Sequence, residues 1–102
     1  MANIYTQNPI YVDTSFGSYK AQVAATLGTL FTLVVTKVRW VGPVNAGDQV
    51  IIDDPAGGAQ LLLMRNTTAN GPDLEEDYST NPRLWRDFSV IIPSGKLFIH
   101  TK

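Results

Sequence analysis

The sequence predicts an all-β fold, an antiparallel β-sandwich of the Ig-like or jelly-roll type with about seven strands. Turn-forming pairs such as Gly42-Pro43 and Asp54-Pro55 recur at short intervals, and short apolar runs of extended type lie between them. The stretch with helical length, residues 19–27, has no convincing apolar stripe. With 102 residues, the chain is expected to form one domain, residues 1–102, around one core.

The N-terminal part is predicted to be extended only in places. Residues 3–6 and 10–12 are short extended pieces, separated by Asn8-Pro9. Residues 14–29 are rich in Ser, Ala, Gly and Thr, and we interpret them as an irregular excursion. Residues 1–29 are therefore expected to form, in part, an extended N-terminal arm.

A long strand over about residues 30–41 is the most informative element. Because a strand sends alternate side chains to opposite faces, one face carries apolar and threonine side chains, namely Leu30, Thr32, Val34, Thr36, Val38 and Trp40. The other face begins with three apolar residues and then turns basic: Phe31, Leu33, Val35, Lys37 and Arg39. We predict that Val34, Val38 and Trp40 lie in the core. The apolar start of the second face is then covered by the N-terminal excursion or by a neighbouring subunit.

The later strands follow from their turns. Gly42-Pro43 ends the long strand, since proline cannot donate to a ladder. Strands are predicted at residues 49–53 and 59–65, joined by the strong turn signal at residues 54–58, so that residues 31–65 form a three-stranded meander. Residues 66–82 are a long polar connection. Two further strands complete the chain, at residues 84–92 and 96–101.

Composition excludes several classes of function. Eight basic and nine acidic residues give a net charge of −1, which disfavours nucleic acid as the main partner. The chain contains no cysteine, which rules out disulfides, a thiolate nucleophile and Cys-ligated metals. The sequence shows no signal-peptide pattern and no apolar run of membrane-spanning length, so we expect the protein to be made in a cytoplasm. Its charged fraction of 17% is low, as in proteins whose surface is covered in use.

No residue pattern indicates catalysis, a cofactor or a metal site, and we predict that the protein is not an enzyme. His100 could act as the general base of a catalytic serine, but the sequence contains no Gly-x-Ser-x-Gly nucleophile motif. The acidic run, Asp73, Glu75, Glu76 and Asp77, lacks the order of a calcium loop and is interpreted as a solvated loop. Trp40 and Trp85 are expected in the core, although strand tryptophans also stack on sugar rings.

Two segments resemble a known group of proteins. The opening NIYTQNPIYVDT and the later stretch TKVRWVGPVNAGDQVIIDDPAGGAQLLL are similar to small β-sandwich virion proteins of tailed bacteriophages, of the head-decoration (cement) type. The resemblance covers residues 3–12 and 36–63. It implies a structural protein, made in the host cytoplasm, that binds the outer surface of a phage head and stabilises it. The implied partners are the major capsid protein and further copies of the chain, as a dimer or trimer, with no membrane or small-molecule substrate.

The resemblance also implies a contact surface. The candidate interface residues lie in the N-terminal segment and at the start of the long strand: Ile4, Tyr5, Ile10, Tyr11, Phe31, Leu33 and Val35. We expect residues 1–13 to act as an arm whose removal leaves a folded domain. Two alternatives are a carbohydrate- or receptor-binding module of a phage fibre, which would use Trp40, Trp85 or Tyr78, and a tail or connector ring protein.

Overall fold

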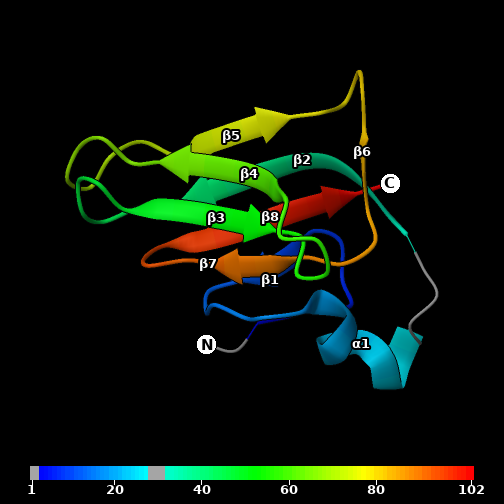
Figure 1. The fold of residues 1–102 in the computed structure, drawn as a ribbon. Coiled ribbons are helices and arrows are strands. Elements are labelled where there is room, and N and C mark those ends of the chain that lie inside the picture. Colours follow the sequence, from blue (N-terminus) through cyan, green and yellow to red (C-terminus); the bar gives the residue numbers. More distant parts are fainter. Residues whose placement is uncertain (1–2, 28–31) are drawn as a thin grey trace.

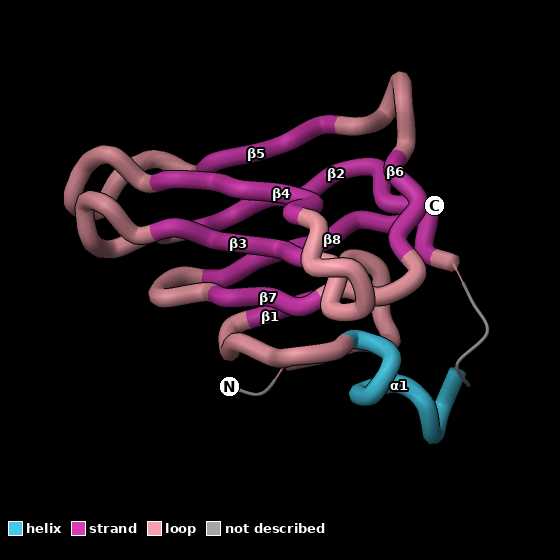
Figure 2. Tube along the Cα trace, viewed as in Figure 1, coloured by secondary structure: helices cyan, strands magenta, loops and turns pink. Residues whose placement is uncertain are grey.

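The computed structural model describes residues 3–27 and 32–102, which form two packed antiparallel sheets (Figures 1 and 2). The predicted all-β sandwich is confirmed. In chain order the elements are β1 (Ile10–Val12), α1 (Tyr19–Leu27), β2 (Leu33–Val41), β3 (Gln49–Asp53), β4 (Gln60–Arg65), β5 (Leu74–Asp77), β6 (Arg83–Trp85), β7 (Ser89–Ile91) and β8 (Lys96–Thr101).

Strand β2 is the centre of the larger sheet, which we call sheet A. On one side it pairs with β8, which in turn pairs with β1. On the other side it pairs with two short strands in succession, β6 opposite Leu33–Val35 and β5 opposite Lys37–Trp40. Sheet B has the order β4-β3-β7 and lies in front of sheet A in Figure 1.

The predicted meander over residues 31–65 is wrong, because β2 and β3 belong to different sheets. Residues 42–48 are longer than a tight hairpin loop, and they carry the chain from sheet A to sheet B. Residues 84–92, predicted as one strand, change sheets in the same way. They form β6 in sheet A and β7 in sheet B, and Phe88 between them is fully buried.

An irregularity in β2 decides which side chains enter the core. Val35 lies opposite Thr101 and Lys37 lies opposite His100, so Thr36 is an extra residue with no partner on β8. Such a bulge shifts the alternation of side chains by one residue. Val35, rather than the predicted Val34, therefore shares the core face with Val38 and Trp40, and all three are fully buried.

The bulge satisfies its own polar groups. The Thr36 hydroxyl donates to the His100 carbonyl oxygen at 3.3 Å, and the Thr36 carbonyl accepts the Tyr78 amide at 2.7 Å. Beyond the C-terminal end of β8, the Lys102 amide donates to the Val34 carbonyl at 2.9 Å. Because its donors and acceptors are paired, the bulge costs little and holds its register.

The N-terminal segment packs on the sandwich. Ile10 and Val12 of β1 are buried, and β1 adds to sheet A beside β8. The segment predicted as an irregular excursion contains helix α1, which places Tyr19 and Val23, one turn apart, in the core. The Tyr19 ring stacks on Phe88 with centroids 4.7 Å apart.

Tertiary contacts account for this helix, which its sequence pattern did not predict. Its first turn is capped by Asp87, a residue far along the chain, whose carboxylate accepts the Lys20 amide at 3.0 Å and the Ser18 hydroxyl at 2.9 Å. The Ser18 hydroxyl oxygen also accepts the Ala21 amide at 3.2 Å. The Ser18 part of this cap is local, but the part supplied by Asp87 from a distant loop is invisible to local propensity.

We expect the two valines beside the bulge to differ in their effect on stability. Val35→Ala removes fully buried methyl groups and should lower the free energy of unfolding by about 2–3 kcal/mol. Val34→Ala, on the half-buried outer side, should cost less than about 1 kcal/mol. Urea titrations followed by tryptophan fluorescence measure both values, since Trp40 and Trp85 are buried. Equal costs for the two substitutions would contradict the placement of the bulge.

Candidate interaction surfaces

The outer face of sheet A is polar and partly aromatic over β8, β5 and the second half of β2, and apolar at β6, where the 69% exposed Leu84 lies opposite Val34. One row of side chains runs across four of its five strands, formed by Tyr11, Phe98, Arg39 and Glu75. The adjacent row is formed by His100, Lys37 and Asp77. These two rows have the composition of a sheet surface that meets water.

The acidic run predicted as a solvated loop is strand β5, so that prediction is wrong. Aspartate, and to a lesser degree glutamate, is depleted in strands, but here the acidic residues lie opposite the basic residues of β2. Arg39 Nη2 lies 2.9 Å from Asp73 Oδ2, and Lys37 Nζ lies 3.6 Å from Glu75 Oε1. Exposed pairs of this kind contribute at most about 1 kcal/mol each. Both pairs run diagonally between the strands, since Arg39 lies opposite Glu75 and Lys37 lies opposite Asp77.

His100 lies among these charges. Partial burial lowers the pKa of its imidazole below the ordinary value, and the neighbouring Lys37 lowers it further. Glu75 opposes these effects and Arg39 adds to them. The imidazole is therefore predominantly neutral at pH 7.

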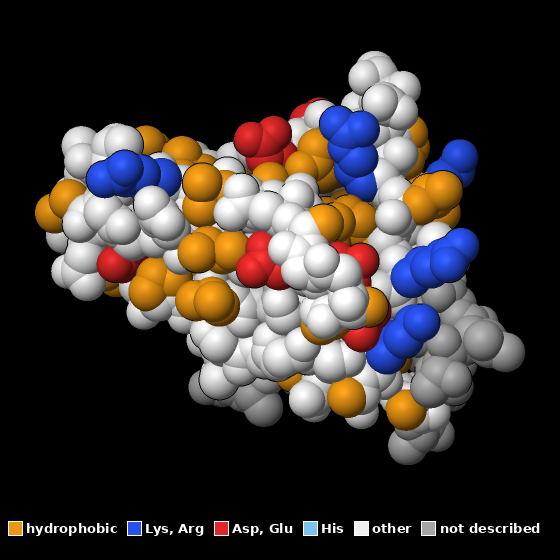
Figure 3. Space-filling model, in the orientation of Figure 1, with side chains coloured by type: hydrophobic (Ala, Val, Ile, Leu, Met, Phe, Trp, Pro, Cys, Tyr) orange, Lys and Arg blue, Asp and Glu red, His pale blue; other side chains and the backbone are white. Residues whose placement is uncertain are grey.

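The outer face of sheet B is apolar at its centre. Ile51 of β3 lies opposite Leu63 of β4 on one side and Ile91 of β7 on the other. Leu63 is 44% exposed and Ile91 is 53% exposed. Figure 3 shows hydrophobic side chains gathered on the face that sheet B turns to the viewer. We call these three residues the apolar row.

The predicted interface did not include the apolar row, although the sequence contains a signal for it. Each strand of sheet B lies in a run of consecutive apolar residues: Val50-Ile51-Ile52, Leu61-Leu62-Leu63-Met64 and Val90-Ile91-Ile92. Such runs are typical of strands that are covered on both faces. A strand with one face in water would alternate instead.

The two sheets differ in how their edges end. The edge of β1 is covered by a bridge between Ile4 and Tyr11, and that of β7 by a bridge between Phe16 and Val90. In the described part of the chain, β4, β5 and β6 each pair on one side only. The open edges of β4 and β5 lie on the same side of the sandwich (Figure 2).

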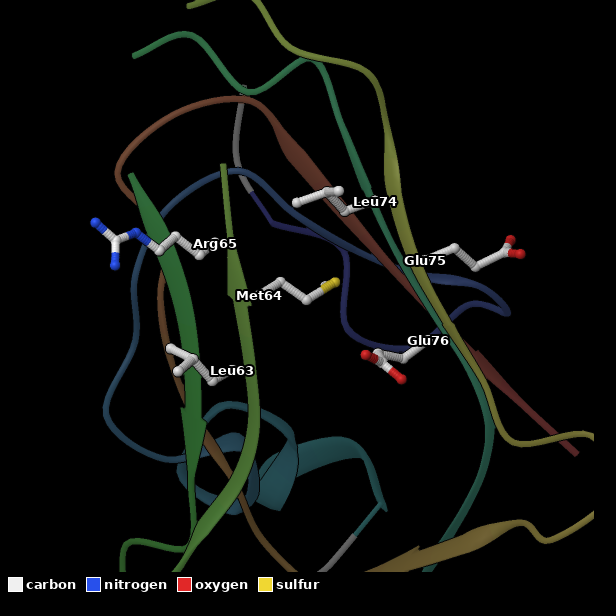
Figure 4. A pocket seen from close by; sticks show the side chains of 6 residues that line it. All are labelled: Leu63, Met64, Arg65, Leu74, Glu75 and Glu76. Atoms are coloured by element: carbon white, nitrogen blue, oxygen red, sulfur yellow. The ribbon is translucent and has the colours of Figure 1, made fainter. Parts of the chain in front are cut away.

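A hollow of about 200 Å³ lies between these open edges. Figure 4 shows Met64, Leu74 and Glu76 pointing into the space between β4 and β5, whereas Leu63, Arg65 and Glu75 point away from it. The hollow is smaller than the roughly 300–1,000 Å³ of typical small-molecule sites. Its geometry is that of a seam between two sheets.

The structure places the predicted interface residues in several environments. Ile10, Tyr11 and Val35 are buried within the chain, while Tyr5 and Leu33 are partly buried against the core. Ile4 is 40% exposed. Phe31 lies outside the described residues. The sequence left open whether the N-terminal excursion or a neighbouring subunit covers the start of β2. Val35 needs neither, because it is buried in this chain's own core.

Both tryptophans are core residues. Trp40 is fully buried and its indole nitrogen donates to the Ser94 carbonyl at 2.8 Å, and Trp85 is 3% exposed. Tyr78 is half-buried, with the Arg83 guanidinium 4.9 Å from its ring centre. The two tryptophans therefore present no ring face on which a sugar could stack.

The described residues offer neither a metal cluster nor a membrane-spanning helix. Residues 3–27 and 32–102 hold no group of three or more His, Cys, Asp or Glu side chains placed to bind a metal ion. Across the same residues, no helix has the length and apolar character needed to cross a membrane.

Comparison with known proteins gives no relative. No family model, no curated protein and no solved structure matches the chain.

His100 provides a test of the electrostatics of sheet A. Because its pKa is lowered in the folded state, the unfolded chain binds more protons in the pH range just below 6.5. The free energy of unfolding should therefore rise as the pH increases towards 6.5 and then level off. His100→Asn should remove this component, as measured by urea titrations from pH 5 to pH 7. An NMR titration that gave His100 a pKa above 6.5 would contradict the argument.

Proposed function

We propose that this protein is a structural virion component, a capsid decoration or cement protein that binds the outer surface of a phage head and stabilises it. The observation that carries the proposal is the apolar row on the outer face of sheet B. A sheet face of this kind is a liability in a free monomer and is typical of a surface that is covered in an assembly. The resemblance of residues 3–12 and 36–63 to head-decoration proteins points to the same class.

The fold suits this role physically. Its small size and low charged fraction of 17% allow many copies to pack at close spacing. Each contact with a shell would be weak, and repetition around symmetry axes would convert weak contacts into stable binding. The major capsid protein is the partner in this proposal, and the chain acts without a catalytic step.

The N-terminal segment belongs to the folded domain and is not a free arm. Residues 1–13 include β1, whose Ile10 and Val12 are in the core. Deleting them would expose the edge of β8 and remove core contacts, so loss of binding after deletion would not identify an arm. A test of function must use the complete chain.

We expect the protein to be present in purified virions in many copies, in fixed ratio to the major capsid protein. Quantitative mass spectrometry of density-purified particles from a culture that produces this chain measures that ratio. Tail-less heads from the same culture provide the control, and should retain the protein. Absence from particles would defeat the proposal. A few copies per particle, lost with the tail, would instead favour a tail or connector ring protein.

A further inference from the structure

We propose that the outer face of sheet B is a self-association surface, on which two copies of this chain pack face to face about a two-fold axis. The axis lies between the two faces and runs along the apolar row, across the strands. Ile51, Leu63 and Ile91 of one copy then cover the same residues of the other. This inference concerns the isolated chain and does not depend on the proposed function.

The contrast between the two outer faces supports this assignment. On sheet A, the exposed basic residues of β2 already have acidic partners on or beside β5. On sheet B, Leu63 and Ile91 leave about half of their surface in water, and Ile51 links them into one continuous row. Pairing this row with a second copy would remove both side chains from water, which is favourable in proportion to the area buried.

The charges at the two ends of the face indicate which partner covers it. Arg65 lies beside Gln49 at one end, and Asp53 lies between Gln60 and Ser89 at the other. Among the described residues, these are the only two charges that strand register places on this face, and neither side chain is in an ion pair there. They have opposite signs and lie on opposite sides of the apolar row.

This arrangement is self-complementary. Rotation about the row brings the Arg65 end of one face over the Asp53 end of the other. Arg65 of one copy then lies over Gln60 of the second copy, one strand spacing of about 4.8 Å from Asp53. A flexible arginine side chain covers that offset, and the symmetry produces the contact twice. A partner with one uniform charge would be repelled by one end of the face.

The size of the face sets the strength of the association. Three strands of about five residues form a patch of about 15 × 17 Å, which is smaller than the patches of standard protein–protein interfaces. We therefore expect weak, concentration-dependent dimers in a rapid equilibrium with monomers.

The first experiment is sedimentation velocity of the complete chain over a wide concentration range. The wild-type protein should show a reversible increase of the sedimentation coefficient towards that of a dimer. The double variant Leu63→Asp with Ile91→Asp should weaken association by more than about a hundredfold, because it places four carboxylates in the apolar centre. Tryptophan fluorescence would verify that this variant remains folded.

Leu84→Asp is the matched control. Leu84 is 69% exposed, but it lies on β6 in sheet A, away from the apolar row. This substitution changes the net charge in the same direction and should leave the association unchanged. Equal weakening by Leu84→Asp would show a general charge effect and would overturn the assignment.

A charge-reversal experiment identifies the partner as a second copy. Arg65→Asp alone and Asp53→Arg alone each place like charges opposite one another in a homodimer, and each should weaken association by about tenfold. An equimolar mixture of the two variants should restore it, because every contact in the mixed dimer is again between opposite charges. Lys96→Asp serves as the charge control on sheet A.

Three results would overturn the proposal. One is a protein that stays monomeric at all concentrations. Another is association that Leu63→Asp with Ile91→Asp leaves intact. The third is a mixture of the charge variants that associates no better than each variant alone. If the double variant instead abolished binding to purified phage heads while the wild-type chain stayed monomeric, the occupant of the face would be the shell, and self-association would be excluded.

Discussion

The bulge at Thr36 is the constraint on which the rest of the sandwich depends. It allows Val35 on one side and Val38 and Trp40 on the other to reach the same core. It also divides the free side of β2 into two parts, so that β6 pairs with the first part and β5 with the second. Without the extra residue, strict alternation would turn half of β2 away from the core. The larger sheet would then lose its central strand.

The chain's crossings between the sheets explain which surfaces remain available. Residues 42–48 and 86–88 carry the chain from sheet A to sheet B, and the N-terminal segment then covers one edge of each sheet through Ile4 and Phe16. In the described part of the chain, β4, β5 and β6 have an uncovered edge, and the uncovered edges of β4 and β5 lie on one side of the sandwich. Such edges are sites of strand pairing unless they are protected. The acidic residues of β5 protect one of them by charge.

The two outer faces have different physical characters, and this difference is the basis of the functional argument. Sheet A presents exposed ion pairs, as expected for a face in water, beside a histidine whose pKa is lowered by partial burial and by Lys37. Sheet B presents Leu63, Ile51 and Ile91 in one row with opposite charges at its two ends. A small sandwich with one hydrated face and one apolar face is suited to assembly. The proposed role in a phage head and the proposed self-association both use that property, and each can fail without the other.

The sequence by itself determined the class of fold, the strands at residues 10–12, 49–53 and 96–101, and the turn at residues 54–58, because these depend on local alternation and on residues such as Pro55 and Gly58. The tertiary structure decided the rest. The bulge arises from pairing with β8, and the helix is held by the core contacts of Tyr19 and Val23 and by the capping contacts of Asp87. The sheet to which a strand belongs depends on where its connecting loop leads. From the sequence, a meander over residues 31–65 therefore could not be distinguished from a crossing between the sheets at residues 42–48. For the same reason, the sequence placed the candidate surface on β2, whereas the structure exposes apolar residues on sheet B. Exposure is a property of the packed sheets, and alternation along one strand does not determine which of its faces is covered.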